Sequence, residues 1–310
     1  MATTAATQTG TGRGRKRAVR VTAVPMGIVA GVLAVAAGAF FGVRPPEAYG
    51  VCMACHGRDL VNWTINLLAH THLEVAQASL VYPVLTTIGV LLGAVLGARI
   101  SGEFRWQNPE SPLKTFTYGG LVMNCALPRW RLFDQAAAAG FGGRGAGRDW
   151  ILRDGGRRHS GDVLATLEGD AVTAAIATLV IGVVLGYLGQ RSRMCFVGGI
   201  RDFILVRDAY LLKGLIAFGL TAWLAFPLAG LIGGARHGPF GSSDALTVTL
   251  TIMGGAGVGF FSTLANGCPL RQHVLAAQGV KSSIAYLAGF FAGAVIFHAW
   301  VAPLFYRLLP

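Results

Sequence analysis

Charged residues are scarce in this chain of 310 residues, and the shortage excludes a soluble fold. Asp, Glu, Lys and Arg together make up 13% of the sequence, about half the share of roughly 25% that soluble domains carry. Hydrophobic residues reach 53% before the 44 glycines are added. Too little polar surface remains to coat a soluble body of this length, so the composition indicates an integral membrane protein.

The sequence also lacks a polar module with clustered basic residues, and this absence argues against a nucleic-acid partner. The formal net charge is nevertheless +12, with 26 Lys and Arg against 14 acidic residues. Several of the basic residues precede the first apolar run, where cytoplasmic flanks of membrane helices retain Lys and Arg. We therefore predict a basic cytoplasmic tail over residues 1–23 and a multi-pass location in a bacterial inner (cytoplasmic) membrane.

The sequence contains long runs without charged residues, and six of them are long enough for bilayer-spanning helices of about 20 residues. A seventh run, residues 115–127, is shorter. The predicted fold is an all-α integral membrane protein built as a polytopic helical bundle. The six long runs are residues 24–43, 80–98, 171–189, 214–235, 245–267 and 282–306.

Three shorter apolar pieces each follow a cysteine-containing turn. Leu60–Ala69, Phe196–Val206 and Leu270–Gly279 are about ten residues long, which as helix reaches only half of the hydrocarbon core. Transporters build central sites from re-entrant half-helices of this kind. Interfacial helices on the membrane surface have the same length, so length alone does not separate the two interpretations.

A repeated motif favours the half-helix interpretation. Both halves contain cysteine, five residues and then Arg-Asp, at an offset of 143 residues, and in both a second cysteine lies 73 residues after the first. We predict two pseudo-symmetric repeats, residues 24–126 and 171–306, that face a shared centre. The matching residues are Cys52 and Cys195, Arg58 and Arg201, Asp59 and Asp202, and Cys125 and Cys268.

The segment 127–170 breaks this pattern, because it is rich in Arg and Gly where the second half has a long span. Charge at the centre of a bilayer is costly, so we predict that this irregular segment stays outside the hydrocarbon core. A slip of the reading frame is a second hypothesis. Trp130–Ala137, shifted by one nucleotide, can spell a turn that is similar to Gly267–Leu270.

The first cysteine pair has a pattern of its own. Cys52, Cys55 and His56 match the covalent haem attachment motif C-x-x-C-H, although the spans on either side leave no room for a cytochrome-sized domain. A zinc site would need a second pair of ligands nearby, and none is present. The alternative function is therefore a membrane redox protein that uses this motif as a c-type haem or dithiol site.

The placement of cysteines after helices suggests a different chemistry for the set. A thiol buried in apolar surroundings stays neutral, donates weak hydrogen bonds and is soft and polarizable. Such thiols would suit a path for a sulfur or selenium anion, whereas a single cysteine is more often a small buried hydrophobic residue. The Arg-Asp motifs are expected either to pair or to extend to the interface. Arg271 could attract an anion to the mouth of the path.

These motifs resemble the signatures of the YeeE/YedE sulfur-transport family. The resemblance rests on Gln190–Phe196, Ile200–Phe203 and Gly267–Gln272, while Tyr49–His56 and Arg58–Trp63 resemble the YedE branch linked with selenium metabolism. It implies a pseudo-symmetric helical fold whose short helices meet at a constriction. It also implies uptake of a sulfur oxyanion such as thiosulfate that is passed between cysteines.

By matching motif, the resemblance assigns the substrate path first to Cys195 and Cys268, then to Cys52 or Cys55, and with least support to Cys125. We expect no cofactor and no enzymatic activity. The expected partners are a small sulfur or selenium anion, the lipid bilayer and a cytoplasmic sulfur-carrier protein.

Overall fold

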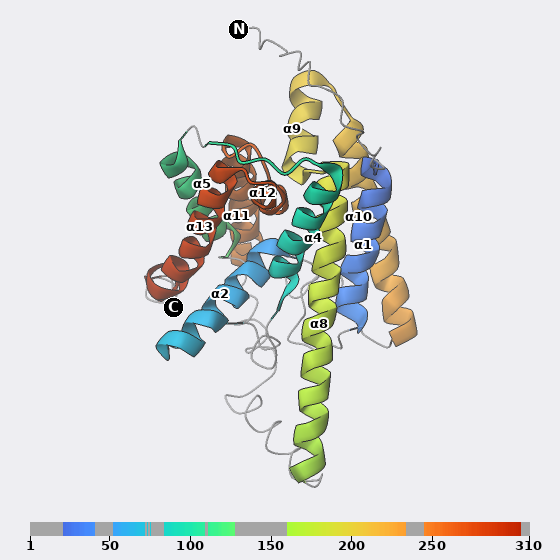
Figure 1. Cartoon of the computed structure of the whole chain (residues 1–310), viewed down its shortest axis with the longest axis vertical. Helices are drawn as coiled ribbons and strands as arrows, with labels where there is room; N and C mark the ends of the chain where they lie inside the picture. Colours follow the sequence, from blue (N-terminus) through green and yellow to red (C-terminus); the bar gives the residue numbers. More distant parts are fainter. Residues whose placement is uncertain are drawn as a thin grey trace.

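The computed structural model describes residues 21–40, 52–71, 73, 75, 84–108, 111–127, 160–233 and 245–304, and all structural statements concern these residues. Its regular elements within them are helices, as the sequence predicts (Figure 1). The elements are α1 (Ala23–Phe40), α2 (Met53–Ala69), α4 (Thr86–Ser101), α5 (Pro112–Ala126), α8 (Ser160–Ser192), α9 (Phe196–Val206), α10 (Tyr210–Gly233), α11 (Ala245–Leu264), α12 (Pro269–Ala277), α13 (Lys281–Ile296) and the π-helical turn η1 (Phe297–Val301).

Four helical stretches are long and apolar enough to cross a membrane, namely Ala175–Val206, Tyr210–Leu228, Val248–Ala277 and Lys281–Leu304. Shorter apolar helices add to them at α1 and α4. Large aliphatic and aromatic side chains, such as Trp223 and Ile252, are exposed on the outer faces of α10 and α11. The chain is an all-α, multi-pass membrane protein, and the prediction of its fold class is confirmed.

Two predicted boundaries differ from the structure. The first short helix begins at Met53 rather than at Leu60, because the Cys52 side chain caps its N-terminus. Helix α8 begins at Ser160, so the last part of the segment predicted to be irregular over 127–170 is helical. Residues 128–159, which carry the Arg/Gly-rich stretch and the proposed frame slip, lie outside the described residues.

Three helix pairs form the frame of the molecule: α4 with α8, α1 with α10, and α5 with α13. Each pair is parallel and meets through glycine. A Cβ placed on Gly93 of α4 would lie 2.0 Å from the carbonyl oxygen of Val183, and one on Gly186 of α8 would lie 2.1 Å from that of Val90. No side chain fits at such a distance, so the backbones are in direct contact, as in other small-residue interfaces between membrane helices.

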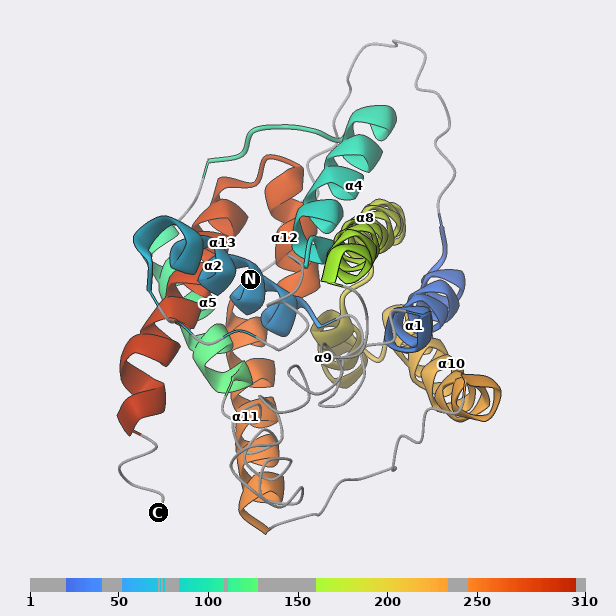
Figure 2. The same ribbon diagram turned by 90° about the horizontal axis from the view of Figure 1, so that it is seen from below.

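The short helices lie among these pairs, with α12 and α9 between the α5–α13 side and the α1–α10 side (Figures 1 and 2). Their first residues share one buried cluster, which contains Met53 at the start of α2, Cys195 before α9 and Cys268 before α12. A second buried cluster lies between α5 and α13. Three helix N-termini therefore begin at the same part of the interior.

A short extended segment connects two of these regions. Residues 103–108 leave the end of α4 and run along the turn between α12 and α13. The N–H of Arg105 donates to the carbonyl oxygen of Gln278 at 3.0 Å, and that of Gln107 donates to the carbonyl oxygen of Gly279 at 3.1 Å. Gly279 has a φ of +94° and its missing Cβ would meet the backbone of Arg105, so this contact needs glycine.

Candidate functional site

Two cysteines that are 73 residues apart in sequence meet at the buried ends of α9 and α12. Cys195 is the N-cap of α9, and its sulfur accepts a hydrogen bond from the N–H of Gly198 at 3.2 Å. The N–H of Cys268 donates to the same sulfur at 3.4 Å, and the two thiols hydrogen-bond to each other. Their residues are 7% and 4% exposed, so this thiol pair is enclosed by protein.

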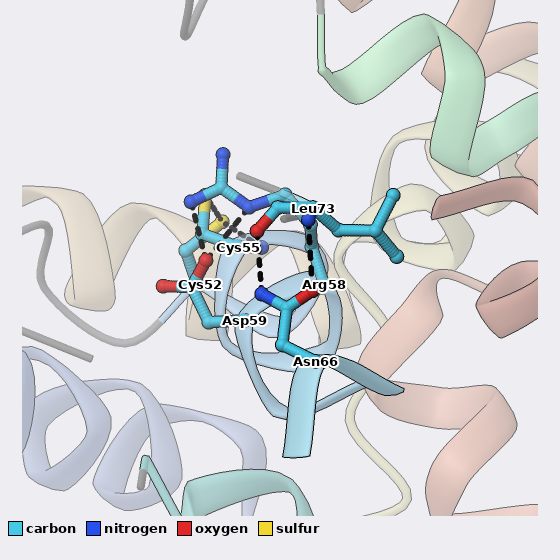
Figure 3. Close-up of polar contacts among 6 residues, drawn as sticks. All are labelled: Cys52, Cys55, Arg58, Asp59, Asn66 and Leu73. Atoms are coloured by element: carbon cyan, nitrogen blue, oxygen red, sulfur yellow. Dashed lines mark hydrogen bonds and ion pairs between the residues drawn. The ribbon is translucent and has the colours of Figure 1, made fainter. Parts of the chain in front are cut away.

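A second thiol pair lies at the start of α2 (Figure 3). Cys52 is the N-cap of this helix, and its sulfur accepts a hydrogen bond from the N–H of Cys55 at 3.3 Å. The two sulfur atoms are 2.7 Å apart, and all five cysteines of the chain are free thiols. Both residues are half-buried, so this pair is more accessible than the one at Cys195 and Cys268.

The helix starts at Cys52 and Cys195 have the same local geometry. Each cysteine is extended, with φ and ψ of −115° and 110° for Cys52 and of −141° and 118° for Cys195. Each sulfur accepts from the amide three residues later, which satisfies one of the free N–H groups of a helix N-terminus. In most helices the acceptor at this position is the side-chain oxygen of a residue such as serine or threonine. Here a sulfur atom takes its place.

The Arg-Asp motif forms an ion pair in both helices but at different depths. In α2, the Arg58 guanidinium donates to Oδ1 of Asp59 from Nε at 2.7 Å and from Nη2 at 2.5 Å, and the side chains are 1% and 0% exposed. A charge at this depth must be paired, because an unpaired one costs several kcal/mol. Arg58 is therefore a buried, paired residue and does not extend to the interface.

In α9 the corresponding pair is half-exposed, and it makes an additional contact. Nε and Nη2 of Arg201 lie 2.9 Å from Oδ1 of Asp202. Nη1 of Arg201 donates to Oδ1 of Asn266 at 3.3 Å. Asn266 precedes Cys268 and has a φ of +57°, so this arginine connects α9 to the turn that carries the second thiol.

Cys125 has a different environment from the other four cysteines. It lies in the last turn of α5, where its sulfur faces Gly257 of α11. Within the described part of the chain it makes no hydrogen bond to another thiol. The structure thus joins Cys195 with Cys268 and Cys52 with Cys55, and it places Cys125 at a contact between two spanning helices.

Positive charge accompanies both thiol pairs. Arg271, in the first turn of α12, interacts electrostatically with Cys195 and Cys268, and Arg58 does so with Cys52 and Cys55. Nη1 of Arg271 is buried and has no hydrogen-bond partner. The N-termini of the capped helices add partial positive charge. Thiols beside a guanidinium suit an anion that is polarizable at one end and oxygen-rich at the other.

Sequence reasoning missed a carboxylate next to this region. Oε2 of Glu103 accepts from Nε2 of Gln190 at 2.8 Å, and Oε1 accepts from Nη2 of Arg193 at 3.3 Å. Glu103 also interacts electrostatically with Arg271. The available signal was its position as an acidic residue directly after a spanning run, in a chain with 14 acids in all.

Two buried polar side chains on α12 and α13, the helices that follow Cys268, were also missed. His273 of α12 and Tyr286 of α13 are each 0% exposed. Neither Nε2 of His273 nor the hydroxyl of Tyr286 has a hydrogen-bond partner in the described part of the chain. Nδ1 of His273 lies 2.7 Å from the carbonyl oxygen of Pro269. A carbonyl oxygen can only accept, so Nδ1 carries the hydrogen of this contact.

Comparison with curated proteins gives two relatives. An uncharacterized protein of Methanocaldococcus jannaschii (MJ1590) is 42% identical over 98 residues, which are 32% of this chain and 93% of that protein. The thiosulfate transporter TsuA of Spirochaeta thermophila is 30% identical over 130 residues, which are 42% of this chain and 33% of TsuA. The second similarity thus spans about a third of the length of that transporter. No solved structure matches the chain significantly.

The family described as Sulphur transport matches residues 2–126 and 191–309 of the chain. The match ends at the residue before the predicted irregular segment and resumes two residues before Arg193, so it contains both thiol pairs and both Arg-Asp motifs. The chain therefore belongs to the Sulphur transport family, and it is a membrane transport protein rather than an enzyme.

Proposed function

We propose that this protein carries a small sulfur oxyanion, thiosulfate or a close analogue, across a bacterial inner membrane. The observation that supports this best is the meeting of Cys195 and Cys268 at two helix N-termini beside Arg271. The terminal sulfur of thiosulfate is soft and would accept weak S–H hydrogen bonds. Its three oxygens would face the guanidinium and the helix N-termini.

The pair at Cys52 and Cys55 is the second substrate-binding position of the same path, after the pair at Cys195 and Cys268. It repeats the helix cap, the neighbouring arginine and the paired aspartate that are found near Cys195. We assign the two binding positions to two repeats, residues 24–126 and 171–306, that are related by approximate symmetry. Cys125 is a further path residue in this proposal, and a cytoplasmic sulfur-carrier protein would receive the transported sulfur.

Selenium analogues of the anion fall within the same proposal. Selenium is softer and more polarizable than sulfur, and thiol donors do not distinguish strongly between the two. Competition for uptake by selenosulfate, in which selenium replaces the terminal sulfur of thiosulfate, therefore tests how far the substrate range extends.

A membrane redox protein is the second candidate function, and the structure favours its dithiol form over its haem form. A c-type haem would lie against His56 with both sulfurs bonded to it. The His56 side chain is 6% exposed, so protein already covers the surface that a porphyrin would need. Gly57, the next residue, packs against Phe290 and Phe291 of α13. Visible absorption of the purified protein checks this, since a covalent haem band would contradict the transport proposal in its present form.

Uptake of thiosulfate labelled at its terminal sulfur, in a bacterial strain without its own sulfur-anion importers, tests the main proposal. We expect uptake by the wild-type chain and none by Cys268→Ala. The matched control is Val122→Ala, which removes buried volume in the α5–α13 cluster and keeps every thiol. Equal uptake by Cys268→Ala and the wild type would contradict the proposal.

A further inference from the structure

A polar network connects the ends of three helices next to the buried thiol pair. Gly102, with a φ of +67°, ends α4 and directs Glu103 toward α8. The Glu103 carboxylate accepts from Gln190, which is 1% exposed, and Gln190 in turn accepts from Nε2 of Gln278 at the end of α12. Arg193 donates to the other oxygen of the carboxylate. The carboxylate is thus held from two directions by residues of α8 and by the turn after it.

The charges in this network do not balance. Arg271 lies two helical turns before Gln278, on the same face of α12. Its guanidinium interacts with Arg193, with Glu103 and with both thiols of the Cys195 pair. Arg193 forms an ion pair with the Glu103 carboxylate at 3.3 Å. Arg271 makes no such direct contact with Glu103 but interacts with it electrostatically, and the buried Nη1 of Arg271 has no hydrogen-bond acceptor among the described residues. A buried donor without an acceptor costs free energy, so Arg271 lacks one hydrogen-bond acceptor, and an anion would meet both this donor and the positive charge.

On the basis of the proposed function, we propose that Glu103 is a specificity-determining residue: its carboxylate is the counter-ion of Arg193 and Arg271 and competes with the substrate anion for them. In the empty protein, its carboxylate partly neutralises the charges of Arg193 and Arg271. When the substrate binds, the oxygen end of the anion takes over this role. An incoming anion must compensate for the loss or weakening of these contacts before it reaches Cys195 and Cys268. Selectivity then arises from repulsion by the Glu103 carboxylate as well as from attraction by the guanidinium groups and the thiols.

This arrangement favours an anion with two charges and several oxygens. Such an anion can satisfy two guanidinium groups at once, through parallel hydrogen bonds that match their planar forks. Chloride offers one charge and no directional set of acceptors, so it gains too little to displace the carboxylate. Sulfate has the charge and the oxygens but lacks the soft sulfur that the thiols would bind.

Glu103 is not needed to hold the helix frame together. Helices α4 and α8 are in direct backbone contact along their length, and the segment after Glu103 is held to α12 by the hydrogen bonds of Arg105 and Gln107. Glu103→Gln keeps a side-chain oxygen that can still accept from Arg193. The substitution removes the charge and keeps the side-chain volume, and the Gln190 amide, which donates to Oε2 of Glu103, must turn to accept from the new NH2 group.

The test is an anion titration of purified protein in detergent, with the melting temperature as readout and constant ionic strength. The probes are sodium thiosulfate and sodium sulfate. We expect both anions to stabilise Glu103→Gln at about tenfold lower concentration than the wild type, the size of a single charge interaction at a partly buried site. In uptake assays the KM for thiosulfate falls, the maximal rate falls because the anion leaves more slowly, and sulfate becomes a stronger inhibitor.

The matched control is Asp208→Asn, which changes the charge of the chain by the same amount elsewhere. Asp208 is exposed and accepts from the N–H of Tyr210 at 2.9 Å, at the start of α10. Its titration midpoints should equal those of the wild type. Equal midpoints for Glu103→Gln and the wild type, or no anion-dependent stabilisation of either, would overturn the assignment of Glu103.

The assay separates this inference from the proposed function. If the wild type fails to take up thiosulfate while Glu103→Gln still shifts the anion midpoints, the transport proposal falls and the role of Glu103 as a counter-ion stands. If thiosulfate uptake depends on Cys268 but the midpoints and the inhibition by sulfate do not change in Glu103→Gln, the transport proposal stands and Glu103 has only a structural role.

Discussion

The backbone N–H of Cys268 donates to the sulfur of Cys195 at 3.4 Å, and this contact brings the N-termini of α9 and α12 together. The same sulfur accepts from the N–H of Gly198 within its own helix. A single sulfur atom therefore accepts from the backbone of two helices. Its capping role and the substrate contact that we propose for it can be separated by substitution, because an oxygen can make the cap but is not soft.

Cys195→Ser should fold normally and lose transport. Serine is among the most favoured N-cap residues, so the bond to Gly198 should persist and the change in stability should stay at or below about 1 kcal/mol. Uptake should fall to background because the hydroxyl is not a soft donor. The measurements are thermal unfolding in detergent and thiosulfate uptake in cells. Wild-type uptake by this variant would mean that the thiol serves only as a cap.

Arg201→Lys should destabilise the protein nearly as much as Arg201→Ala does. The guanidinium bonds Asp202 and Asn266 from three nitrogen atoms at once, and an ammonium lacks this planar fork. The measurement is the yield of monodisperse protein in detergent. The control is Arg207→Lys, since Arg207 is exposed and lies over the ring of Phe203. A wild-type yield for Arg201→Lys would remove the proposed link between α9 and the turn at Asn266.

Arg58→Ala and Asp59→Ala should each be strongly destabilising. Both side chains are buried, and removing one ion-pair partner leaves the other charge in the interior, at a cost of about 3–5 kcal/mol. The double variant Arg58→Ala, Asp59→Ala should cost less than the sum of the two single variants, because neither charge remains. Chemical unfolding of the three variants gives the coupling free energy. Additive effects would show that the two charges act independently.

Mild oxidation should block transport by converting the thiol pair at Cys52 and Cys55 to a disulfide. Diamide accepts the two thiol hydrogens of Cys52 and Cys55 and becomes the hydrazine, while the sulfurs form a disulfide. This pair is half-buried and its sulfurs are 2.7 Å apart, so a soluble oxidant should reach it before it reaches the enclosed pair at Cys195. Uptake should fall, and dithiothreitol should restore it. Peptide mapping after alkylation would contradict this prediction if it located the disulfide elsewhere.

A cysteine placed at Gly145, in a version of the protein without the native thiols, should react with a membrane-impermeant maleimide from one side. The prediction rests on the sequence, because the segment 127–170 holds many charges and each would cost about 2.5–3.5 kcal/mol at the bilayer centre. Protection from reagent on both sides would mean that the segment is buried.

Sequencing of the coding DNA, compared with close relatives, checks the reading frame over the same stretch.

Charge-free length predicted the spanning helices well, and the cysteine turns located the short ones. Side-chain depth was harder to predict, as the two Arg-Asp motifs illustrate. Arg58 and Arg201 have the same local sequence pattern, yet one is fully buried and the other half-exposed. The difference depends on which helices pack around them, and that is a tertiary property that motif spacing does not contain.

The contact between Glu103 and Gln190 could not be predicted from the sequence for a related reason. The residues are 87 positions apart, and they meet only because α4 and α8 run parallel with their ends level. That pairing depends on where glycines face each other along two helices, and many other glycine alignments were possible in this sequence. The start of α2 was missed because a cysteine cap is not among the usual signals for a helix N-terminus.

The glycine contacts of the three helix pairs also limit how the protein can move. Where the backbone of α4 touches that of α8, there are no flexible side chains between the helices to absorb sliding. A shift along the axis would drive the Val183 carbonyl toward the next residue that carries a Cβ. Each helix pair should therefore move as one rigid body. The displacements that let a substrate pass must occur between these rigid bodies, or in the short cysteine-capped helices that lie among them.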